Sequence, residues 1–94
     1  MKKFAVVLSM KDEEKSATHR QAHLDFLDEM RKLNRVLLFG RFPDGSGGLV
    51  IYEAETREEV EAWVKEDPYI TLGARDYSIH EWDMQTDHEF VRKS

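Results

Sequence analysis

Blocks of apolar residues separated by polar segments predict four strands along this chain. The nearly continuous apolar run at residues 4–10 is typical of a central strand that is buried on both faces. Residues 36–42 and 49–53 predict two more strands, and the glycine-rich segment 43–48 predicts the hairpin loop between them. Residues 77–84 alternate in polarity and predict the fourth strand.

Two segments between these strands carry the spacing of amphipathic helices. In the first, side chains that face the core recur three and four residues apart, at His23, Phe26, Leu27, Met30 and Leu33. Ser16 is the expected N-cap of this helix, which we predict to run to about residue 34. The second helix is predicted to open on the capping-box pattern of residues 56–59 and to stop at Asp67-Pro68, because proline disfavours helical backbone in the preceding residue.

The resulting order, β-α-β-β-α-β, predicts an α+β fold of the ferredoxin-like type. Its antiparallel four-stranded sheet is expected to carry both helices on one face, within a domain at 1–84 that is followed by a tail at 85–94. In this topology the start of the first helix and the end of the second lie at the same edge of the sheet. His23 and Asp67 are therefore expected to be neighbours, although 44 residues separate them in the sequence.

The opposite face of the predicted sheet has no helix to cover it. One parity of the last strand places Trp82 and Met84 on that face, beside Ser78 and His80. Exposed apolar sheet faces normally mark interfaces, so we predict a homodimer in which two sheets pack into a barrel-like assembly.

Composition narrows the function classes further. The chain has 94 residues, of which 40% are apolar and 35% charged, and this suits a single globular domain. A net charge of −5 argues against binding to nucleic acid or to anionic lipid, and no apolar run approaches the length of a membrane span. The absence of cysteine excludes disulfides and thiolate chemistry and is compatible with the cytoplasmic location that we expect.

His23 and Asp67 form the candidate catalytic pair. A carboxylate fixes the tautomer of an imidazole and stabilises its protonated form, so that the other ring nitrogen exchanges a proton with a substrate. A histidine on an apolar helix face is more often a hydrogen-bonded core residue, and an Asp-Pro pair is often a simple turn. These structural interpretations stand beside the catalytic one.

Candidate substrate-binding residues surround this pair. Arg20, one turn before His23, is suited to hold a carboxylate or phenolate, Ser46 offers a hydroxyl, and Tyr69 is a candidate for the pocket wall. Arg41 and Arg75 suggest anion binding more weakly. His19 and His23 have the spacing of a metal-binding pair, but no third ligand at suitable spacing accompanies them. We therefore expect neither a metal nor a cofactor.

Several short motifs, in this order and spacing, resemble the YCII-related (YciI-like) family over roughly residues 1–84. They are Arg20, His23-Leu24, Gly40, Gly47-Gly48, Asp67-Pro68-Tyr69 and Ile79-His80-Glu81-Trp82. The resemblance implies a ferredoxin-like homodimer whose cleft holds a histidine and an aspartate as the proposed catalytic pair. It also implies that dehydrochlorination of a small hydroxylated aromatic is among the family's activities. Arg41 stands where the family usually has proline, and the loop before Gly48 is altered, so the substrate class does not carry over.

Three hypotheses for the function follow. The first is a cofactor-free enzyme that performs lyase or isomerase chemistry on a small cyclic or aromatic molecule through His23 and Asp67. The second is a non-catalytic dimeric module that binds a small ligand or a partner protein. The third is a cofactor-independent oxygenase on the same architecture, which no residue specifically favours.

Overall fold

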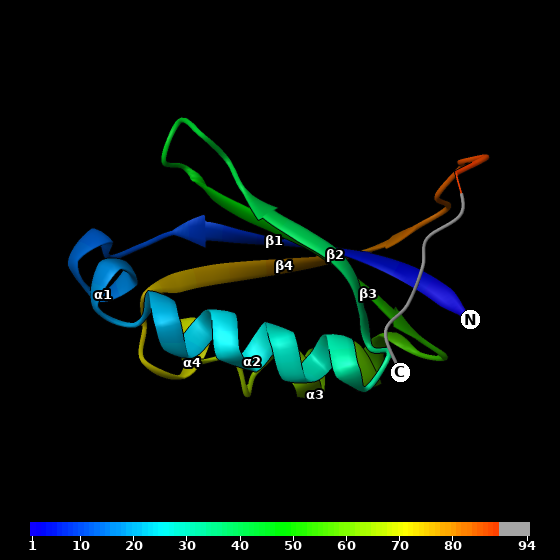
Figure 1. Cartoon of the computed structure of the whole chain (residues 1–94), viewed down its shortest axis with the longest axis horizontal. Helices are drawn as coiled ribbons and strands as arrows, with labels where there is room; N and C mark the ends of the chain where they lie inside the picture. Colours follow the sequence, from blue (N-terminus) through cyan, green and yellow to red (C-terminus); the bar gives the residue numbers. More distant parts are fainter. Residues whose placement is uncertain (89–94) are drawn as a thin grey trace.

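The computed structural model describes residues 1–88 of the protein, and 89–94 lie outside the described residues. The chain folds as an α+β domain (Figure 1). Its elements are β1 (Lys2–Met10), α1 (Glu13–Thr18), α2 (Arg20–Lys32), β2 (Val36–Arg41), β3 (Gly47–Ala54), α3 (Arg57–Val64), α4 (Pro68–Thr71) and β4 (Arg75–Trp82). The predicted order is confirmed, but the first predicted helix is divided into α1 and α2, and a short helix that was not predicted, α4, follows the second.

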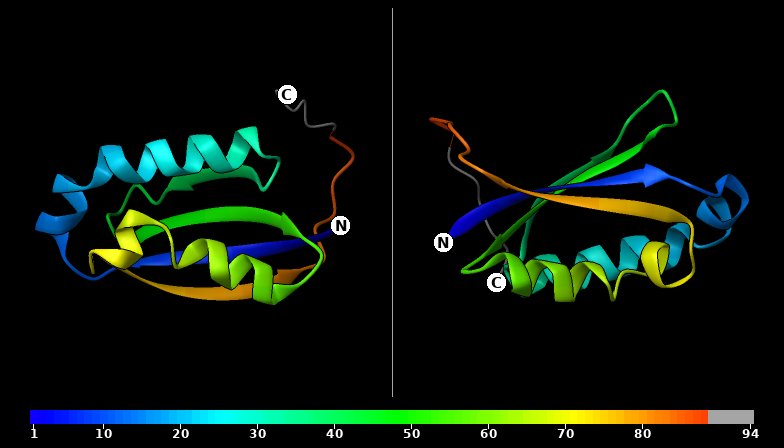
Figure 2. Two further views of the ribbon diagram at one scale, coloured as in Figure 1. Left: turned by 90° about the horizontal axis from the view of Figure 1, so that it is seen from below. Right: turned by 180° about the vertical axis from the view of Figure 1, so that it is seen from behind.

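The four strands form one antiparallel sheet in the order β2-β3-β1-β4, which is the ferredoxin-like arrangement predicted from the sequence. Helices α2, α3 and α4 cover one face of this sheet, and α1 lies at its end (Figure 2). The register places Val6 opposite Val50 on one side and opposite Ile79 on the other, so β3, β1 and β4 present buried side chains to the same helices.

The hydrophobic core lies between this face and the helices. Its largest buried side chains come from both layers and include Phe4, Val6, Val50, Tyr52, Leu27, Val60 and Val64. Trp63 is half-buried at the margin of this core, where its ring lies 6.3 Å from that of Tyr52. No helix within residues 1–88 is long and apolar enough to cross a membrane.

The first predicted helix begins earlier than expected and is interrupted at His19. The prediction that Ser16 is the N-cap was wrong: Asp12 caps α1, and its Oδ1 accepts a hydrogen bond of 3.0 Å from the Lys15 amide. Ser16 instead lies buried inside α1. The end of α2 agrees with the prediction, because Leu33 is its C-cap and Asn34 follows with a left-handed φ of 60°.

The second predicted helix also differs at its end. Its capping box is confirmed, since the Thr56 hydroxyl accepts from the Glu59 amide and the Glu59 carboxylate accepts from the Thr56 amide. However, α3 ends at Val64, before the Asp-Pro pair, and that pair opens the short helix α4. The reason is that proline suits the first turn of a helix, because the backbone N–H groups there have no hydrogen-bond partner within the helix and the one that proline lacks is not needed.

The last strand, β4, begins and ends two residues earlier than predicted. It runs over Arg75–Trp82 rather than 77–84, so Met84 lies beyond the sheet. Residues 83–88 form neither helix nor strand, and the remainder of the predicted tail at 85–94 is outside the described residues.

Ser78, His80 and Trp82 alternate with the buried Ile79 and lie on the face that no helix covers. A hydrogen-bond distance of 3.2 Å between Ser78 Oγ and His80 Nε2 agrees with this parity. Leu38 of β2 is 38% exposed and Trp82 is 44% exposed, which leaves large apolar side chains accessible to solvent.

Gly47 allows β3 to begin against β1. A Cβ atom at this position would lie only 2.1 Å from the Leu8 carbonyl oxygen, and the φ of 143° also disfavours any larger residue. The close approach sets the start of the β1–β3 ladder and the position of the hairpin, which projects beyond the rest of the sheet (Figure 1).

Candidate active site

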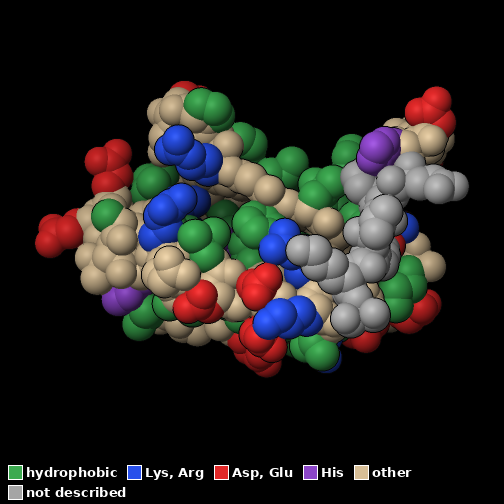
Figure 3. Space-filling model, in the orientation of Figure 1, with side chains coloured by type: hydrophobic (Ala, Val, Ile, Leu, Met, Phe, Trp, Pro, Cys, Tyr) green, Lys and Arg blue, Asp and Glu red, His purple; other side chains and the backbone are tan. Residues whose placement is uncertain are grey.

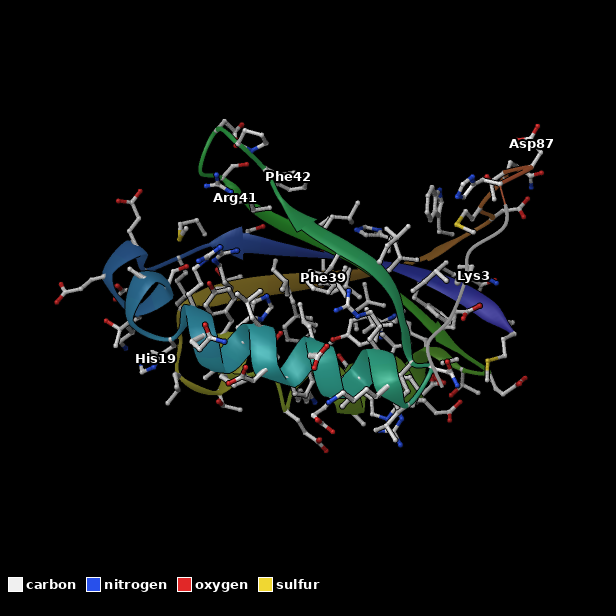
Figure 4. The ribbon with its side chains drawn as sticks, in the orientation of Figure 1. Lys3, His19, Phe39, Arg41, Phe42 and Asp87 are labelled. Atoms are coloured by element: carbon white, nitrogen blue, oxygen red, sulfur yellow. The ribbon has the colours of Figure 1, made fainter. Side chains whose placement is uncertain are left out.

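A pocket of about 500 Å³ opens at the sheet edge where the sequence predicted that distant elements meet. Its walls come from α1 and α2, from the end of β2 and the hairpin loop, and from α4 and the start of β4. Figure 3 shows basic side chains beside the hollow between the hairpin and the helices. Figure 4 shows Arg41 and Phe42 at the hairpin and Phe39 between β2 and α2.

His23 and Asp67 form a buried pair at this pocket. The Nδ1 atom of His23 lies 2.9 Å from both carboxylate oxygens of Asp67. The Asp67 side chain is 1% exposed and that of His23 is 10% exposed, so the imidazole is the member of the pair that lines the pocket. Because an ionised carboxylate only accepts hydrogen bonds, Nδ1 donates and the neutral ring keeps Nε2 as an acceptor.

The local backbone fixes the position of Asp67. As the N-cap of α4, Asp67 accepts a hydrogen bond of 2.9 Å from the Tyr69 amide through Oδ1, and Pro68 occupies the first helical position. The same carboxylate thus ends a turn and holds the imidazole. Both interpretations of the Asp-Pro motif, as a turn and as a partner of His23, describe the structure.

Tyr69 packs directly on His23. The two rings are stacked with centroids 3.9 Å apart and planes inclined by 12°. The Arg75 guanidinium lies 4.5 Å from the centroid of the Tyr69 ring. A parallel ring at van der Waals distance leaves no room for a cation on the same face, so Tyr69 is held between His23 and Arg75.

Arg75 is itself fixed by hydrogen bonds. Its Nη2 and Nε atoms donate to the Ser16 hydroxyl at 2.8 and 3.3 Å, and Nη1 donates to the Leu8 carbonyl at 3.2 Å. These contacts connect the start of β4 with α1 and β1. The result is a continuous stack from Arg75 through Tyr69 to His23, which restricts the orientation of the imidazole.

Tyr52 forms part of the core beneath Asp67. Burial, together with the negative charge of Asp67, raises the pKa of the Tyr52 phenol far above its ordinary value. Tyr52 therefore remains a neutral hydroxyl and does not supply protons near neutral pH.

The structure brings most of the predicted site residues together. Arg20 and Tyr69 line the pocket with His23, and so do Arg41 and Arg75, which were weaker candidates for anion binding. Ser46 does not line it: this exposed residue lies in the hairpin loop, where its amide donates to the Asp44 carboxylate at 2.9 Å.

His19 also lies outside the pocket, at the junction of α1 and α2 (Figure 4). No group of three or more histidine, cysteine or acidic side chains suited to a metal ion occurs within residues 1–88. The pocket lining also includes apolar side chains that were not predicted as site residues, namely Met10, Leu24, Phe39 and Phe42. In the sequence, these apolar residues follow the same pattern as residues of the hydrophobic core, so they could not be told apart from core residues.

Comparison with known proteins places this architecture in a family. The model of the YCII-related domain matches residues 2–83, which is most of the chain. The chain belongs to the YCII-related domain family. The uncharacterised protein YjpA of Bacillus subtilis (strain 168) is 31% identical over 80 residues, which cover 85% of this chain and 94% of YjpA.

A solved structure of similar fold is that of 5-chloro-2-hydroxyhydroquinone dehydrochlorinase (TftG) from Burkholderia phenoliruptrix AC1100, in complex with 2,5-dihydroxybenzoquinone. It aligns with a TM-score of 0.76 at 20% identity and covers 88% of this chain and 95% of TftG. At this identity the similarity establishes the shared fold of the two proteins.

Proposed function

We propose that this YCII-related protein is a cofactor-free enzyme that moves a proton on a small cyclic or aromatic substrate. The observation that carries the proposal is the buried contact of 2.9 Å between His23 Nδ1 and Asp67, which leaves Nε2 as the ring nitrogen available to a ligand in the pocket. Arg20, on the same wall of the pocket, is the proposed anchor for an anionic group of the substrate.

In the proposed reaction, His23 Nε2 takes a proton from a carbon or hydroxyl of the substrate. The electron pair left behind forms a new double bond. In an elimination, the leaving group departs with its bonding electrons, and the imidazolium then releases its proton to solvent. In an isomerisation, the imidazolium returns the proton to a different atom of the substrate. Asp67 stabilises the imidazolium in either case, and the stacked Tyr69 ring keeps its plane fixed.

The similarity to TftG supports lyase chemistry as the first activity to test. That protein is named as a dehydrochlorinase of 5-chloro-2-hydroxyhydroquinone, a small hydroxylated aromatic. A pocket of about 500 Å³ with aromatic walls is large enough for a single-ring compound of this kind.

The experiment compares proton abstraction by the wild type and by three variants. A panel of single-ring hydroxylated and halogenated compounds, beginning with 5-chloro-2-hydroxyhydroquinone, is incubated in D2O, and NMR follows turnover and deuterium incorporation. We expect His23→Gln to lower the rate by a factor of ~100 or more and Asp67→Asn to lower it less, since general acid–base catalysis typically contributes 10²–10⁴-fold.

His19→Gln is the matched control, because it removes a histidine one helical turn away that does not line the pocket. It is expected to keep the wild-type rate. Equal rates for the wild type and His23→Gln on every compound that turns over would overturn the proposed mechanism. Wild-type protein that binds these compounds but neither converts them nor exchanges their protons would favour a non-catalytic binding module.

We also propose that the protein forms a homodimer through the open face of its sheet. Supporting observations are the exposed side chains of Leu38 and Trp82 and the half-buried Val7 and Leu49 on the same face. Light scattering at micromolar concentration is expected to give twice the mass of the chain for the wild type and less for Trp82→Glu. A monomeric wild type would refute this assembly.

A further inference from the structure

The arginine side chains of this acidic protein are unevenly distributed. The chain carries a net charge of −5, yet Arg20, Arg41 and Arg75 all line the one pocket described above. Glu13 is the single carboxylate among the described residues that line it. The pocket therefore presents three guanidinium groups against one carboxylate, which is the reverse of the balance of the whole chain.

None of these three arginines forms an ion pair with a carboxylate within residues 1–88. Elsewhere in that range, exposed basic residues commonly do so: Arg31 pairs with Asp28 at 3.2 Å and Arg57 with Glu61 at 3.8 Å. Arg20 and Arg41 are exposed and come from different elements around the pocket, one from α2 and the other from the end of β2. Their hydrogen-bond donors are available to a ligand.

Arg75 differs from these two because it is already held. Its donors engage Ser16 and the Leu8 carbonyl, and its plane lies over Tyr69. It contributes a fixed positive charge at the inner wall, whereas Arg20 and Arg41 are free to close on an oxygen that enters between them. Phe39 and Phe42, both half-buried, give the same pocket flat apolar walls that suit a planar ring.

We propose that Arg20 and Arg41 together hold the ionised oxygen of a planar aromatic ligand, so that the pocket selects anions over neutral molecules of the same shape. This inference deepens the proposed function and rests on it for the location of the site. A guanidinium presents its N–H groups in a planar fork that matches a carboxylate or a phenolate-type oxygen. The ligand would place that oxygen between the two arginines and its ring against the phenylalanines, within reach of His23.

Binding of small probes tests this inference without any turnover. Two pairs of compounds differ in charge but hardly in shape: benzoate with benzamide, and 4-nitrophenolate with 4-nitroaniline. Affinities are measured by NMR titration of the full chain at a pH where the phenol is ionised. We expect the wild type to bind each anion about tenfold or more tightly than its neutral partner, and added salt to narrow the difference.

The variants assign this preference to particular residues. Arg20→Gln and Arg41→Gln are each expected to lower the affinity for the anions about tenfold and to leave the affinity for the neutral partners unchanged. The affinity of Arg20→Lys for the anions should lie between those of the wild type and Arg20→Gln, because lysine keeps the positive charge but lacks the planar fork of N–H groups. Arg57→Gln is the matched control, because it removes the same charge from α3, outside the pocket.

Each outcome either supports or overturns the inference that the pocket selects anions. A preference confined to benzoate identifies a carboxylate as the preferred group, and one confined to 4-nitrophenolate identifies a phenolate-type oxygen. Equal affinity for anions and neutral partners, no binding of any probe, or a loss in Arg57→Gln as large as that in Arg20→Gln would overturn the inference. Because these titrations involve no turnover, a wild type that prefers the anions but neither converts nor exchanges any compound in D2O would overturn the proposed catalysis alone, so the two failures are distinguishable.

Discussion

Replacement of Asp67 provides a quantitative test of how the candidate site is held together. In Asp67→Ala the Tyr69 amide loses its cap, which costs about 1 kcal/mol. The buried Nδ1 atom of His23 also loses its partner, and an unsatisfied buried polar group costs about 1–3 kcal/mol. We therefore expect the free energy of unfolding to fall by roughly 2–4 kcal/mol, a large part of the stability of a small domain.

Asp67→Asn should be much milder, for a geometric reason. Oδ1 lies 2.9 Å from both the Tyr69 amide and His23 Nδ1, so an asparagine oxygen in the same place keeps the cap. The amide nitrogen then occupies the position of Oδ2, which is also 2.9 Å from Nδ1. Whichever tautomer the ring adopts, one of these two contacts sets donor against donor or acceptor against acceptor. The expected cost is about 1 kcal/mol.

Urea unfolding at a single protein concentration measures both values. Asp44→Ala is the control, since Asp44 also accepts a hydrogen bond of 2.9 Å from the amide two residues later, but at an exposed position with no histidine. Its loss of stability should be a small fraction of that in Asp67→Ala. If Asp67→Ala lost no more stability than Asp44→Ala, the buried pair would contribute nothing. If Asp67→Asn were as unstable as Asp67→Ala, the argument that asparagine keeps the cap on the Tyr69 amide would be refuted.

Two further predictions concern the elements that carry the site. Gly47→Ala forces a Cβ onto the Leu8 carbonyl oxygen at 2.1 Å and should lower the free energy of unfolding by roughly 3 kcal/mol or more. Gly40→Ala, whose Cβ would meet nothing within 4 Å, should leave the free energy of unfolding unchanged or raise it by up to about 1 kcal/mol. Equal urea midpoints for the two variants would contradict this. Thr56→Ala removes the acceptor for the Glu59 amide and should cost about 1 kcal/mol in the same assay, and Thr56→Ser should restore most of it. A Thr56→Ser variant as unstable as Thr56→Ala would argue against the cap.

Topology made the central contact of the site predictable from sequence. The strand pattern fixes which ends of the helices share an edge, and this alone places His23 near Asp67. The contact tolerates errors of a few residues in the helix boundaries, because both residues stay near the same edge of the sheet although α2 begins at Arg20 and α3 ends at Val64. Ser46 lies outside the pocket lining, and its role in substrate binding stays a prediction. Its place in the loop was correct, but the bond from its amide to Asp44 belongs to the loop itself.

The helix boundaries show where local signals are insufficient. Residues 16–20 contain neither glycine nor proline, so nothing in the sequence marks the interruption at His19. The neighbouring Ser16 is bound by Arg75, a contact across 59 residues that no local pattern encodes. By contrast, the start of α4 was encoded, because an aspartate followed by proline is a typical helix opening as well as a helix stop.

The site combines a fixed interior with a variable mouth, and this division follows from where each residue is anchored. His23, Tyr69 and Arg75 are held by stacking and by hydrogen bonds to elements far away in the chain. Arg41 lies at the hairpin that projects beyond the sheet, is exposed, and stands where the family resemblance leads us to expect proline. A change at that position alters what the pocket admits without moving the imidazole. We therefore expect substitutions at Arg41 to change ligand preference while leaving the stability of the His23–Asp67 pair intact.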